Sequence, residues 1–497
     1  MFTFYFVGHN FEYETRNALR VFDLNIKYEI KEKNQLNDNK GLGLLSILEK
    51  INDEFIGTSK LYYDNDLLYE SQFSSKDIVL EKENEKKLNK TLVVKSMHNV
   101  MRKYYNIEPN YGILTGVRPV KILLTAKDSG KSNEEINNIL KNTYEVSEEK
   151  IKLLWEVLKI EDKYINKELN SKNYNIYIGI PFCPSKCIYC SFTSYVNCKE
   201  TKIENYLKTL VYEIEKTIEL ALCKNLNLNS IYIGGGTPSF LNEHQINLIF
   251  EVIKKYYDLS TIKEITFEAG RPDTITKEKL MILKDNFVNR ISINPQTMKQ
   301  ETLDEIGRKH SINDIKEKYE LSRDIGFNSI NMDIILGLPN EDDKDCEHTI
   351  DEIIKLRPEN ITVHSLSYKT GSFLRQSNEH QLAKEYVLLK NMHEVVEKKC
   401  IEAGYKPYYM YRQKNIKGEL ENVGYTLENK ESIYNIVIIE EIETILACGA
   451  GVSSKIKLEN NRHEPVYNFK GLEEYSKRID EIIEKKKMLL NIWKESI

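Results

Sequence analysis

The sequence has no apolar run that approaches the roughly 20 residues of a transmembrane helix. One apolar stretch, NIVIIEEIETILACGAGV, is interrupted by Glu440 and Glu441. The N-terminal residues, MFTFYFVGHNFEYETRN, lack the basic segment and the small-residue cleavage site of a secretory signal. We therefore expect a cytoplasmic protein without a membrane span.

An excess of basic residues is also missing. The 497 residues include 71 Lys and Arg against 76 Asp and Glu, which gives a formal net charge of -5 at pH 7. Nucleic acids and anionic membranes attract basic surfaces at long range. We therefore expect no nucleic acid partner and no anionic membrane as the main partner.

Cysteine is scarce, with eight residues in the whole chain. A disulfide scaffold of this length needs more, and in a reducing compartment clustered thiols more often bind metal. Three cysteines lie within eight residues, at Cys183, Cys187 and Cys190. The other five are scattered, and we expect them to be small buried side chains: Cys198, Cys223, Cys346, Cys400 and Cys448.

From about residue 172, strand patterns alternate with helix patterns. β-branched runs are followed by segments in which apolar residues recur every three to four positions, as at Ile203, Leu207 and Leu210. Six such units in series predict an α/β fold with a parallel sheet and covering helices. The predicted strands are YNIYIGI, SIYIGGG, EITFEAG, RISINPQ, SINMDIILG and ENITVHSL, with helices near 202–221, 246–253, from 277, 300–326, 345–356 and 384–403.

The two faces of these strands differ in character. One parity is apolar and is expected to face the helices, as with Ile176, Ile231 and Ile265. The other parity would point into a barrel, and an ordinary closed barrel fills its interior with Val, Ile and Leu. Here that parity is polar, which favours an incompletely closed barrel around a large polar ligand. The alternative is that these polar groups satisfy one another: Tyr177, Thr266, Glu268, Ser292, Asn294, Asn331, Asp333, Thr362 and His364.

The two ends of the chain have different patterns. Residues 1–170 combine strand-like pieces, TFYFVGH and KTLVVKS, with amphipathic helices near 90–105 and 133–168, which predicts an N-terminal α+β domain of unknown role. Its segment GILTGVRPVKILL is a structural turn or, alternatively, an anion site at a helix N-terminus. We expect the core at 171–375 and a small C-terminal domain at 376–497 that completes the substrate site.

Cys183, Cys187 and Cys190 form the motif CxxxCxxC in a loop that Pro181 opens, because proline cannot extend the strand ladder. Structural zinc usually takes four ligands supplied as two close pairs. That pairing is absent, although His364 could complete a Cys3His site. The spacing better matches three corners of an iron–sulfur cubane whose fourth iron stays open to an outside ligand.

A CxxxCxxC loop after the first strand of a (βα)6 series, with the aromatic Tyr189 before the last cysteine, resembles the radical S-adenosylmethionine (SAM) superfamily. The resemblance implies a partial (βα)6 barrel and a 4Fe-4S cluster held by Cys183, Cys187 and Cys190. It also implies that the open iron binds the amino and carboxylate groups of SAM. An electron passed to the sulfonium would then release methionine and a 5'-deoxyadenosyl radical, which abstracts a hydrogen atom from the substrate. The protein would orient the cofactors and exclude water and oxygen.

The resemblance also implies further SAM contacts. GGGTPSF contains Gly235 and Gly236, which have no side chains, followed by Thr237. Backbone donors of this segment would then be able to approach the amino acid part of SAM. Glu268 at the end of the third strand would pair with the ammonium group or the ribose. The remaining positions that match are Tyr177 before the cluster loop, Gln296 and Arg308 for ribose and carboxylate, Asp333 for ribose, and Ile335 beside the adenine.

YIGIPFC, GGGTPSF, FEAGRPDTIT, NPQT, GRKHS and DIILGLP together resemble the oxygen-independent coproporphyrinogen III oxidase group. GILTGVRP, YRQKN, ENVGY and GAGVSSK are similar to its HemZ-type coproporphyrinogen dehydrogenase branch. This resemblance implies oxidative decarboxylation of tetrapyrrole propionates to vinyl groups, with a flavodoxin or ferredoxin as electron donor. Candidate side chains for the substrate carboxylates are Arg271, Lys309, His310 and Arg412.

Two features depart from the characterised oxidases. They carry a further cysteine two residues after the triad, where this chain has Phe192. Their N-terminal segment over the active site has no counterpart in residues 1–170, which puts a second SAM in doubt. A haem chaperone of the same superfamily, or another radical SAM tetrapyrrole enzyme such as a methyltransferase, are therefore the alternatives.

Overall fold

The computed structural model describes residues 2–22, 27–79, 84–165, 170–367, 382–413, 420–458 and 462–495. Within these ranges the chain forms two compact units. The first contains the described residues of 1–158, 375–391 and 411–421, and the second contains those of 159–374, 392–410 and 422–497. The division into three domains near 170 and 375 stays a prediction. No helix in the described ranges combines the length and the apolar character needed to cross a membrane.

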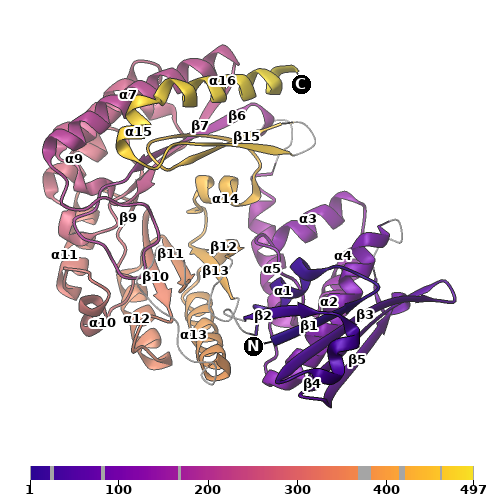
Figure 1. Ribbon diagram of the computed structural model, residues 1–497. Helices are drawn as coiled ribbons and strands as arrows, with labels where there is room; N and C mark the ends of the chain where they lie inside the picture. Colours follow the sequence, from indigo (N-terminus) through magenta and orange to yellow (C-terminus); the bar gives the residue numbers. More distant parts are fainter. Residues whose placement is uncertain are drawn as a thin grey trace. The chain divides into compact units, whose positions relative to one another are not determined.

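The first unit is an α+β fold (Figure 1). Its sheet has the order β2-β1-β3-β4-β5, in which β1 is parallel to β2 and β3, and β3, β4 and β5 form an antiparallel meander. Buried residues of the long helix α2, among them Met97 and Met101, pack with Phe4, Leu44 and Leu61 of the sheet. The strands are β1 (Phe2–Val7), β2 (Tyr28–Lys31), β3 (Leu42–Ile51), β4 (Glu54–Tyr63) and β5 (Asp66–Ser74), and the helices are α1 (Glu12–Leu19), α2 (Glu85–Tyr105), α3 (Val120–Asp128), α4 (Asn133–Asn138) and α5 (Glu148–Glu161).

The segment KTLVVKS, expected to be strand-like, lies inside α2, so that prediction is wrong. The side chain of Asn84 accepts a hydrogen bond from the Lys87 backbone N–H and caps the helix. Leu88, Leu92 and Val93 are buried. Capping and burial therefore override the preference of the β-branched run for a strand.

The segment GILTGVRPVKILL forms a turn that precedes α3. Gly112 has a φ of +49°, and its backbone N–H donates to the carbonyl of Pro109 at 3.0 Å. The N–H of Ile113 donates to Tyr144 O and that of Leu114 to Tyr111 O, both at 2.9 Å. These contacts agree with the structural interpretation of the segment.

The second unit is built on an 11-stranded sheet of order β12-β13-β11-β10-β9-β8-β7-β6-β14-β15-β16. The six strands β6 to β11 are parallel and consecutive, as expected from the sequence. Since β6 is flanked by β7 and β14, and β11 by β10 and β13, the six strands do not close on themselves in the described part. The prediction of a partial (βα)6 barrel is confirmed. The core strands are β6 (Asn173–Ile180), β7 (Asn227–Gly235), β8 (Glu264–Glu268), β9 (Arg290–Ser292), β10 (Ile330–Leu336) and β11 (Asn360–Ser365).

Strands from the C-terminal part of the chain extend both sides of this sheet. β14 pairs in parallel with β6, and β13 pairs antiparallel with β11. The sheet therefore unites the predicted core with later parts of the chain. The added strands are β12 (Lys406–Arg412), β13 (Glu421–Thr426), β14 (Thr444–Cys448), β15 (Ser453–Lys457) and β16 (His463–Tyr467).

The helices lie along the outer face of the six strands (Figure 1). Ile176, Ile231, Ile265, Ile291 and Ile361, all of the apolar parity, are fully buried. Full burial of such a side chain contributes about 1.5–3 kcal/mol relative to exposure. The helices are α7 (Glu200–Cys223), α8 (Glu243–Lys254), α9 (Lys277–Asp285), α10 (Gln300–Glu305), α11 (Ile312–Asp324), α12 (Asp343–Leu356) and α13 (Leu382–Glu402), with α14 (Ile433–Glu440), α15 (Leu472–Lys477) and α16 (Ile479–Glu495) in the C-terminal region.

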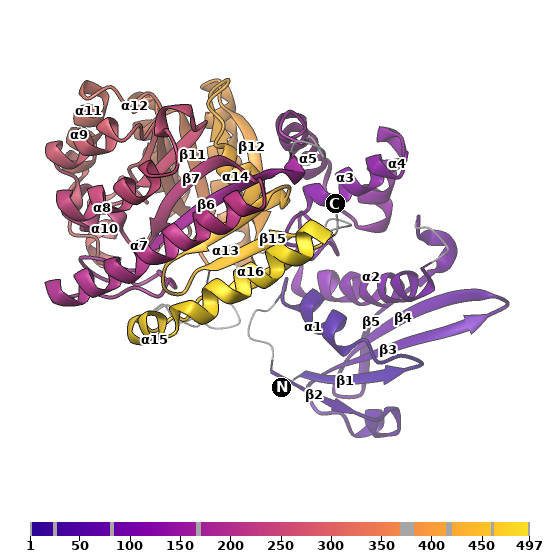
Figure 2. The same cartoon turned by 90° about the horizontal axis from the view of Figure 1, so that it is seen from above.

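Helices α7 and α16 lie side by side in both views (Figures 1 and 2). Between them the ammonium group of Lys486 donates to Glu213 Oε1 at 2.8 Å, to Ala447 O at 2.7 Å and to Thr217 Oγ1 at 3.1 Å. Neither Lys486 nor Glu213 is exposed. A buried ion pair with all three ammonium donors in use thus links the last helix to α7 and β14.

Candidate cluster and cofactor site

The three cysteines of the motif lie in a loop that leaves the end of β6 and folds back on itself. The Cys183 N–H donates to Tyr195 O at 3.0 Å, and the Tyr195 N–H donates to Pro181 O at 2.7 Å. The Cys190 N–H donates to Cys187 O at 3.1 Å. Cys183 and Cys187 are buried and Cys190 is half-buried. These backbone hydrogen bonds hold the loop that carries the three thiols.

The thiols of Cys183 and Cys190 have raised pKa values. Burial raises the pKa of Cys183, and the neighbouring Cys187 raises it further. Burial also raises the pKa of Cys190, with Cys187 and Cys183 acting in the same direction. Metal ligation requires thiolates, so binding here would release protons.

Three thiols presented by one loop are compatible with an iron–sulfur cluster. No group of three or more His, Cys, Asp or Glu side chains in the described ranges is arranged to hold one metal ion. A cubane binds each thiolate at a different iron, so its ligand sulfurs lie farther apart than those around one zinc ion. His364 pairs with Asp333 at 3.8 Å instead of joining a Cys3His site.

The glycine turn at the end of β7 packs directly against the cysteine loop. The Gly236 N–H donates to Ile180 O at 2.7 Å, the Thr237 N–H donates to Phe182 O at 2.8 Å, and the Thr237 hydroxyl donates to Cys183 Sγ at 3.4 Å. A Cβ added at Gly236 would lie 3.0 Å from Cys183 Sγ. These backbone donors are already engaged, so the turn contributes chiefly by its close approach to the loop. Their predicted contact with SAM stays a prediction.

Glu268 lies at the end of β8, beside this turn. Its Oε1 accepts a hydrogen bond from the Tyr232 hydroxyl at 2.5 Å and its Oε2 accepts one from the Gly235 N–H at 3.2 Å. Burial raises the pKa of Glu268 to about 7, although the hydrogen bond from Tyr232 acts in the opposite direction. The carboxyl group therefore titrates near neutral pH and can hold a cationic ligand when ionised.

A stack of three tyrosines lines the same interior. Tyr177 stacks on Tyr232 with a ring separation of 5.9 Å, and Tyr232 stacks on Tyr434 at 4.5 Å. Burial raises the pKa of each of the three hydroxyls. The sequence predicted that Tyr177 points into the barrel. Tyr232 and Tyr434 were missed, although the inward parity of Tyr232 was a signal for it.

Polar groups on β10 and β11 satisfy one another in part. Asn331 Nδ2 donates to Asp333 Oδ1 at 2.7 Å, and the Thr362 hydroxyl donates to Asn331 Oδ1 at 2.9 Å. Burial alone would raise the pKa of Asp333, but contact with His364 and these hydrogen bonds lower it. Ile335, two residues farther along the strand, is largely buried. The alternative of mutual satisfaction therefore holds for Asn331, Asp333 and Thr362, whereas both side-chain polar atoms of Asn360 on β11 have no hydrogen-bond partner within the described residues.

On β8, at the end of β9 and in the segment that follows it, buried polar side chains lack hydrogen-bond partners within the described residues. Four buried side-chain oxygens have no hydrogen-bond partner within the described residues: Thr266 Oγ1, Ser292 Oγ, Asn294 Oδ1 and Gln296 Oε1. Gln296 also has a φ of +69°, an uncommon conformation for a residue with a side chain. Buried polar atoms without partners are rare, so this region is suited to a polar ligand.

Arg308 follows α10 in a turn that Gly307 makes with a φ of +79°. Its Nη2 donates to Asn294 O at 2.5 Å, and its buried Nε has no hydrogen-bond partner in the part of the chain described. Tyr189 is half-buried; burial raises its pKa, and Arg308 opposes the shift. The structure thus brings Arg308, Tyr189 and the orphaned interior oxygens to the same end of the barrel as the cysteines.

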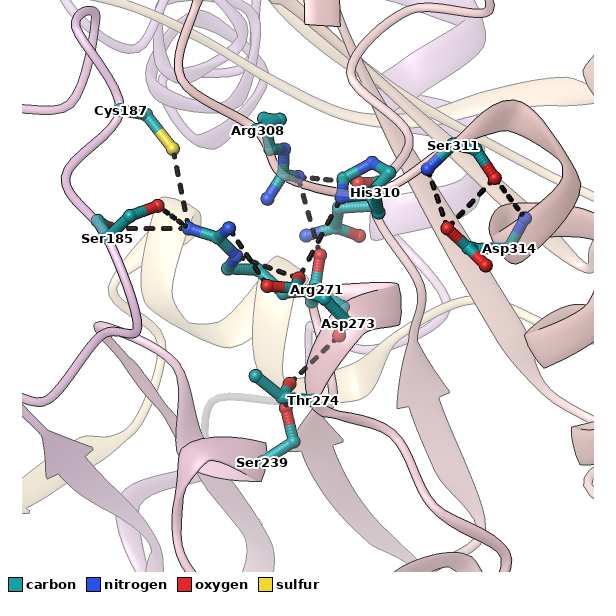
Figure 3. A network of polar contacts seen from close by, with 12 residues as sticks. Ser185, Cys187, Ser239, Arg271, Asp273, Thr274, Arg308, His310, Ser311 and Asp314 are labelled. Atoms are coloured by element: carbon teal, nitrogen blue, oxygen red, sulfur yellow. Dashed lines mark hydrogen bonds and ion pairs between the residues drawn. The ribbon is translucent and has the colours of Figure 1, made fainter. Parts of the chain in front are cut away.

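The four residues predicted to bind substrate carboxylates differ in their surroundings. Arg271 and His310 are buried and both contact Asp273, at 3.0 Å and 3.8 Å (Figure 3). Lys309 is exposed. Arg412 lies in the first unit and contacts residues of that unit. It is buried over the ring of Tyr111, and its guanidinium group donates to Leu114 O. Binding of carboxylates by these four residues stays a prediction.

Comparison with known proteins adds to this geometry. The sequence profile of the radical SAM superfamily matches residues 177–353, the range that contains the cysteine loop and most of the barrel. The oxygen-independent coproporphyrinogen-III oxidase-like protein HemZ of Bacillus subtilis is 40% identical over 425 residues, which are 84% of this chain and 83% of that protein. The chain belongs to the radical SAM superfamily, in its HemZ branch. This confirms the predicted family.

Other relatives in the superfamily match smaller parts. The haem chaperone HemW of Bacillus subtilis is 38% identical over 191 residues, or 38% of this chain and 49% of that protein. The solved structure of coproporphyrinogen III oxidase (HemN) from Escherichia coli superposes with a TM-score of 0.50 at 20% identity, covering 64% of this chain and 71% of that one. This likeness confirms the fold.

Membership of the superfamily confirms the predicted cofactors, a 4Fe-4S cluster and SAM. The donor set of this chain fits them, because three thiols in one loop leave one iron without a protein ligand. The roles of the individual side chains are proposals.

Proposed function

We propose that the chain is a radical SAM oxidoreductase that decarboxylates propionate groups of coproporphyrinogen III oxidatively to vinyl groups, giving protoporphyrinogen in haem biosynthesis. The observation that supports this most is the similarity to HemZ over most of both chains. The intact cysteine loop and the unsatisfied polar interior beside it agree with a catalytic site.

With the cofactors bound, the cluster and SAM supply the one-electron chemistry that removes a hydrogen atom from the substrate. Each of the two propionates that react would lose that hydrogen from its β-carbon, then carbon dioxide, and would pass one electron to an external one-electron acceptor as it becomes a vinyl group. The reaction therefore needs a site that binds a large polyanionic substrate next to a buried, water-excluding cofactor.

The chain's own residues would divide these tasks. Cys183, Cys187 and Cys190 would hold three irons in a loop that backbone hydrogen bonds fold back on itself. Glu268 would bind a cationic or hydroxyl group of SAM, since its carboxyl group is buried and accepts only two hydrogen bonds in the described structure. Gln296 would offer its unpaired oxygen to SAM.

The remaining predicted contacts would complete the SAM site: Arg308, Asp333, Ile335, Tyr177, Tyr189 and the turn at Gly235, Gly236 and Thr237. Lys309 is the exposed cation next to Arg308, so it is the residue best placed among the candidates of the second unit to meet a substrate carboxylate. A flavodoxin or ferredoxin type protein would deliver the electron.

A haem chaperone is the second candidate. Its support is the similarity to HemW together with Phe192, which occupies the position after the triad where the oxidases have a cysteine and whose side chain is 64% exposed. A radical SAM methyltransferase acting on a tetrapyrrole is the third candidate.

One anaerobic experiment separates the three. The reconstituted full chain is incubated with SAM, a reductant and coproporphyrinogen III, and the products are analysed by mass spectrometry. Loss of carbon dioxide with formation of 5'-deoxyadenosine is the expected result. Methylated product would indicate the methyltransferase, and haem retained without turnover would indicate the chaperone; either result contradicts the proposal.

A pair of cysteine variants tests the ligand assignment. Cys187→Ala should give a folded, colourless protein that releases no 5'-deoxyadenosine. Cys223→Ala, which removes an exposed cysteine at the end of α7, is the matched control and should keep full iron content. Equal iron content and turnover in both variants would show that Cys187 is not a ligand.

A further inference from the structure

Arg271 follows β8 and is 3% exposed. A guanidinium group stays charged in proteins, so a buried one needs partners for its charge and its donors. Nε and Nη2 donate to the two oxygens of Asp273, at 3.0 Å and 3.1 Å. This bidentate pair fixes the plane of the guanidinium group.

The remaining edge of Arg271 faces the cysteine loop (Figure 3). Nη1 donates to Ser185 Oγ at 2.8 Å and to Ser185 O at 3.2 Å, and it lies 4.0 Å from Cys187 Sγ. Ser185 stands between the first two cysteines of the motif. The group therefore contacts both the backbone of the loop and one of its sulfurs.

The loop is held from a second side as well. The Ser185 hydroxyl donates to Gly307 O at 3.1 Å, while it accepts from Arg271. Asp273, in turn, lies 3.8 Å from His310 Nδ1. A chain of contacts thus runs from the turn after α10 through Asp273 and Arg271 to the loop.

We propose that Arg271 is a positioning residue for the iron–sulfur cluster, which holds the Cys183–Cys187 segment through Ser185 and directs a cationic N–H toward the Cys187 sulfur. The inference rests on the cysteine ligands of the proposed function but not on the tetrapyrrole substrate. It gives Arg271 a role other than binding a substrate carboxylate, because Nε, Nη1 and Nη2 each already donate to a protein oxygen.

The charges of Arg271 and Asp273 predict the direction in which each residue shifts the reduction potential of the cluster. Hydrogen bonds to the sulfurs and the net charge near a cluster set its reduction potential. A fixed cation at Cys187 favours the reduced cluster, which carries one more negative charge. Asp273 binds the opposite edge of the guanidinium group, so its anion offsets this effect only in part.

Two variants with opposite charge changes test the inference in the full chain. Arg271→Gln removes the cation, so reduction should become about tenfold less favourable, which for one electron is about 59 mV. Asp273→Asn removes the anion and should make reduction more favourable. The midpoint potential is measured by an anaerobic redox titration followed by electron paramagnetic resonance, with iron and sulfide content determined in parallel.

Arg290→Gln is the matched control, because Arg290 is equally buried but donates to Ser329 and Lys430 and to no atom of the cysteine loop in the described contacts. It should leave the potential unchanged. Arg271→Lys keeps the charge without the fork and should restore part of the potential but not the full iron retention. A purely structural role would lower iron content without opposite shifts in potential.

Unchanged potential in Arg271→Gln and Asp273→Asn at full cluster loading would overturn the inference. If Arg271→Gln fails to fold, Asp273→Asn and Arg271→Lys still test the inference. Unchanged midpoint potentials in both of these variants would refute it. A wild-type chain that binds no cluster overturns the proposed function too. A wild-type chain that binds the cluster, shows both shifts and leaves coproporphyrinogen unchanged refutes only the proposed function.

Discussion

Replacing Lys486 with methionine should destabilise the second unit strongly. The ammonium group is unexposed and donates three hydrogen bonds, to Glu213 Oε1, Thr217 Oγ1 and Ala447 O, at 2.7–3.1 Å. Methionine keeps the apolar stem of the side chain but leaves the buried Glu213 without its cation. Removal of one partner of such a pair costs about 3–5 kcal/mol.

The structure limits how far Glu213 can compensate. Its carboxylate also accepts from the Gly449 N–H at 2.8 Å, from Asn468 Nδ2 at 2.8 Å and from the Tyr475 hydroxyl at 2.5 Å. These donors stabilise the anion but supply no opposite charge. The additional change Glu213→Gln should therefore recover part of the lost stability, with a coupling of about 0.5–3 kcal/mol.

Urea unfolding followed by circular dichroism measures the effect. Lys487→Met is the control, since Lys487 is the neighbouring lysine on the same helix, is about half exposed and pairs only weakly with Glu484 at 3.4 Å. Its change should stay within about 0.5 kcal/mol. A Lys486→Met protein within about 1 kcal/mol of the wild type would refute the reasoning.

Three further predictions concern other sites. Gly236→Ala should lower iron content after reconstitution, because the added Cβ would lie 2.8 Å from a carbonyl of the cysteine loop, whereas Gly270→Ala, with its nearest atom at 3.6 Å, should not. Burial raises the pKa of Glu161 well above 4.5. As pH rises above 4.5, the folded chain therefore retains a proton on Glu161 that the unfolded chain releases. Glu161→Gln should stabilise the protein above that pH and have little effect below it. Thermal melts at pH 4 and pH 8 measure this difference. SAM binding, measured calorimetrically, should strengthen as pH rises through about 7, where Glu268 ionises. Tyr232→Phe should move this transition to higher pH, because it removes a hydrogen bond that lowers the pKa of Glu268. A SAM affinity that does not change with pH would contradict the assignment of Glu268.

The barrel strands could be predicted because local sequence and tertiary position agree there. Ile176 and Ile231 alternate with polar residues, and each strand is followed by a helix with an apolar stripe, so the same residues specify the element and its orientation. The segment KTLVVKS shows the opposite case. Its composition favours a strand, but the cap at Asn84 and the burial of Leu92 are decisive, and they are visible only when the flanking residues and the partner sheet are considered.

The three candidate cysteine ligands could be identified from the sequence because all three lie in one short motif. The contacts that surround them could not, since Ser185, Arg271 and His310 come from three separate turns and only the folded chain brings them together. Tyr434 was missed for the same reason: nothing near it in the sequence indicates that it stacks on a tyrosine of β7. The place of β14 in the sheet was also not predictable, because a short, fully buried apolar strand has no alternating pattern.

The pairing of β6 with β14 affects the order in which the protein can be built. Because β14 follows β6 far along the chain, the strand that leads into the cysteine loop lacks one of its neighbours until Cys448 has been synthesised. Contacts between such distant segments form slowly, since a long loop must close first. We therefore expect nascent chains that end before Thr444 to leave this loop exposed to oxygen, and cluster insertion to follow the synthesis of β14.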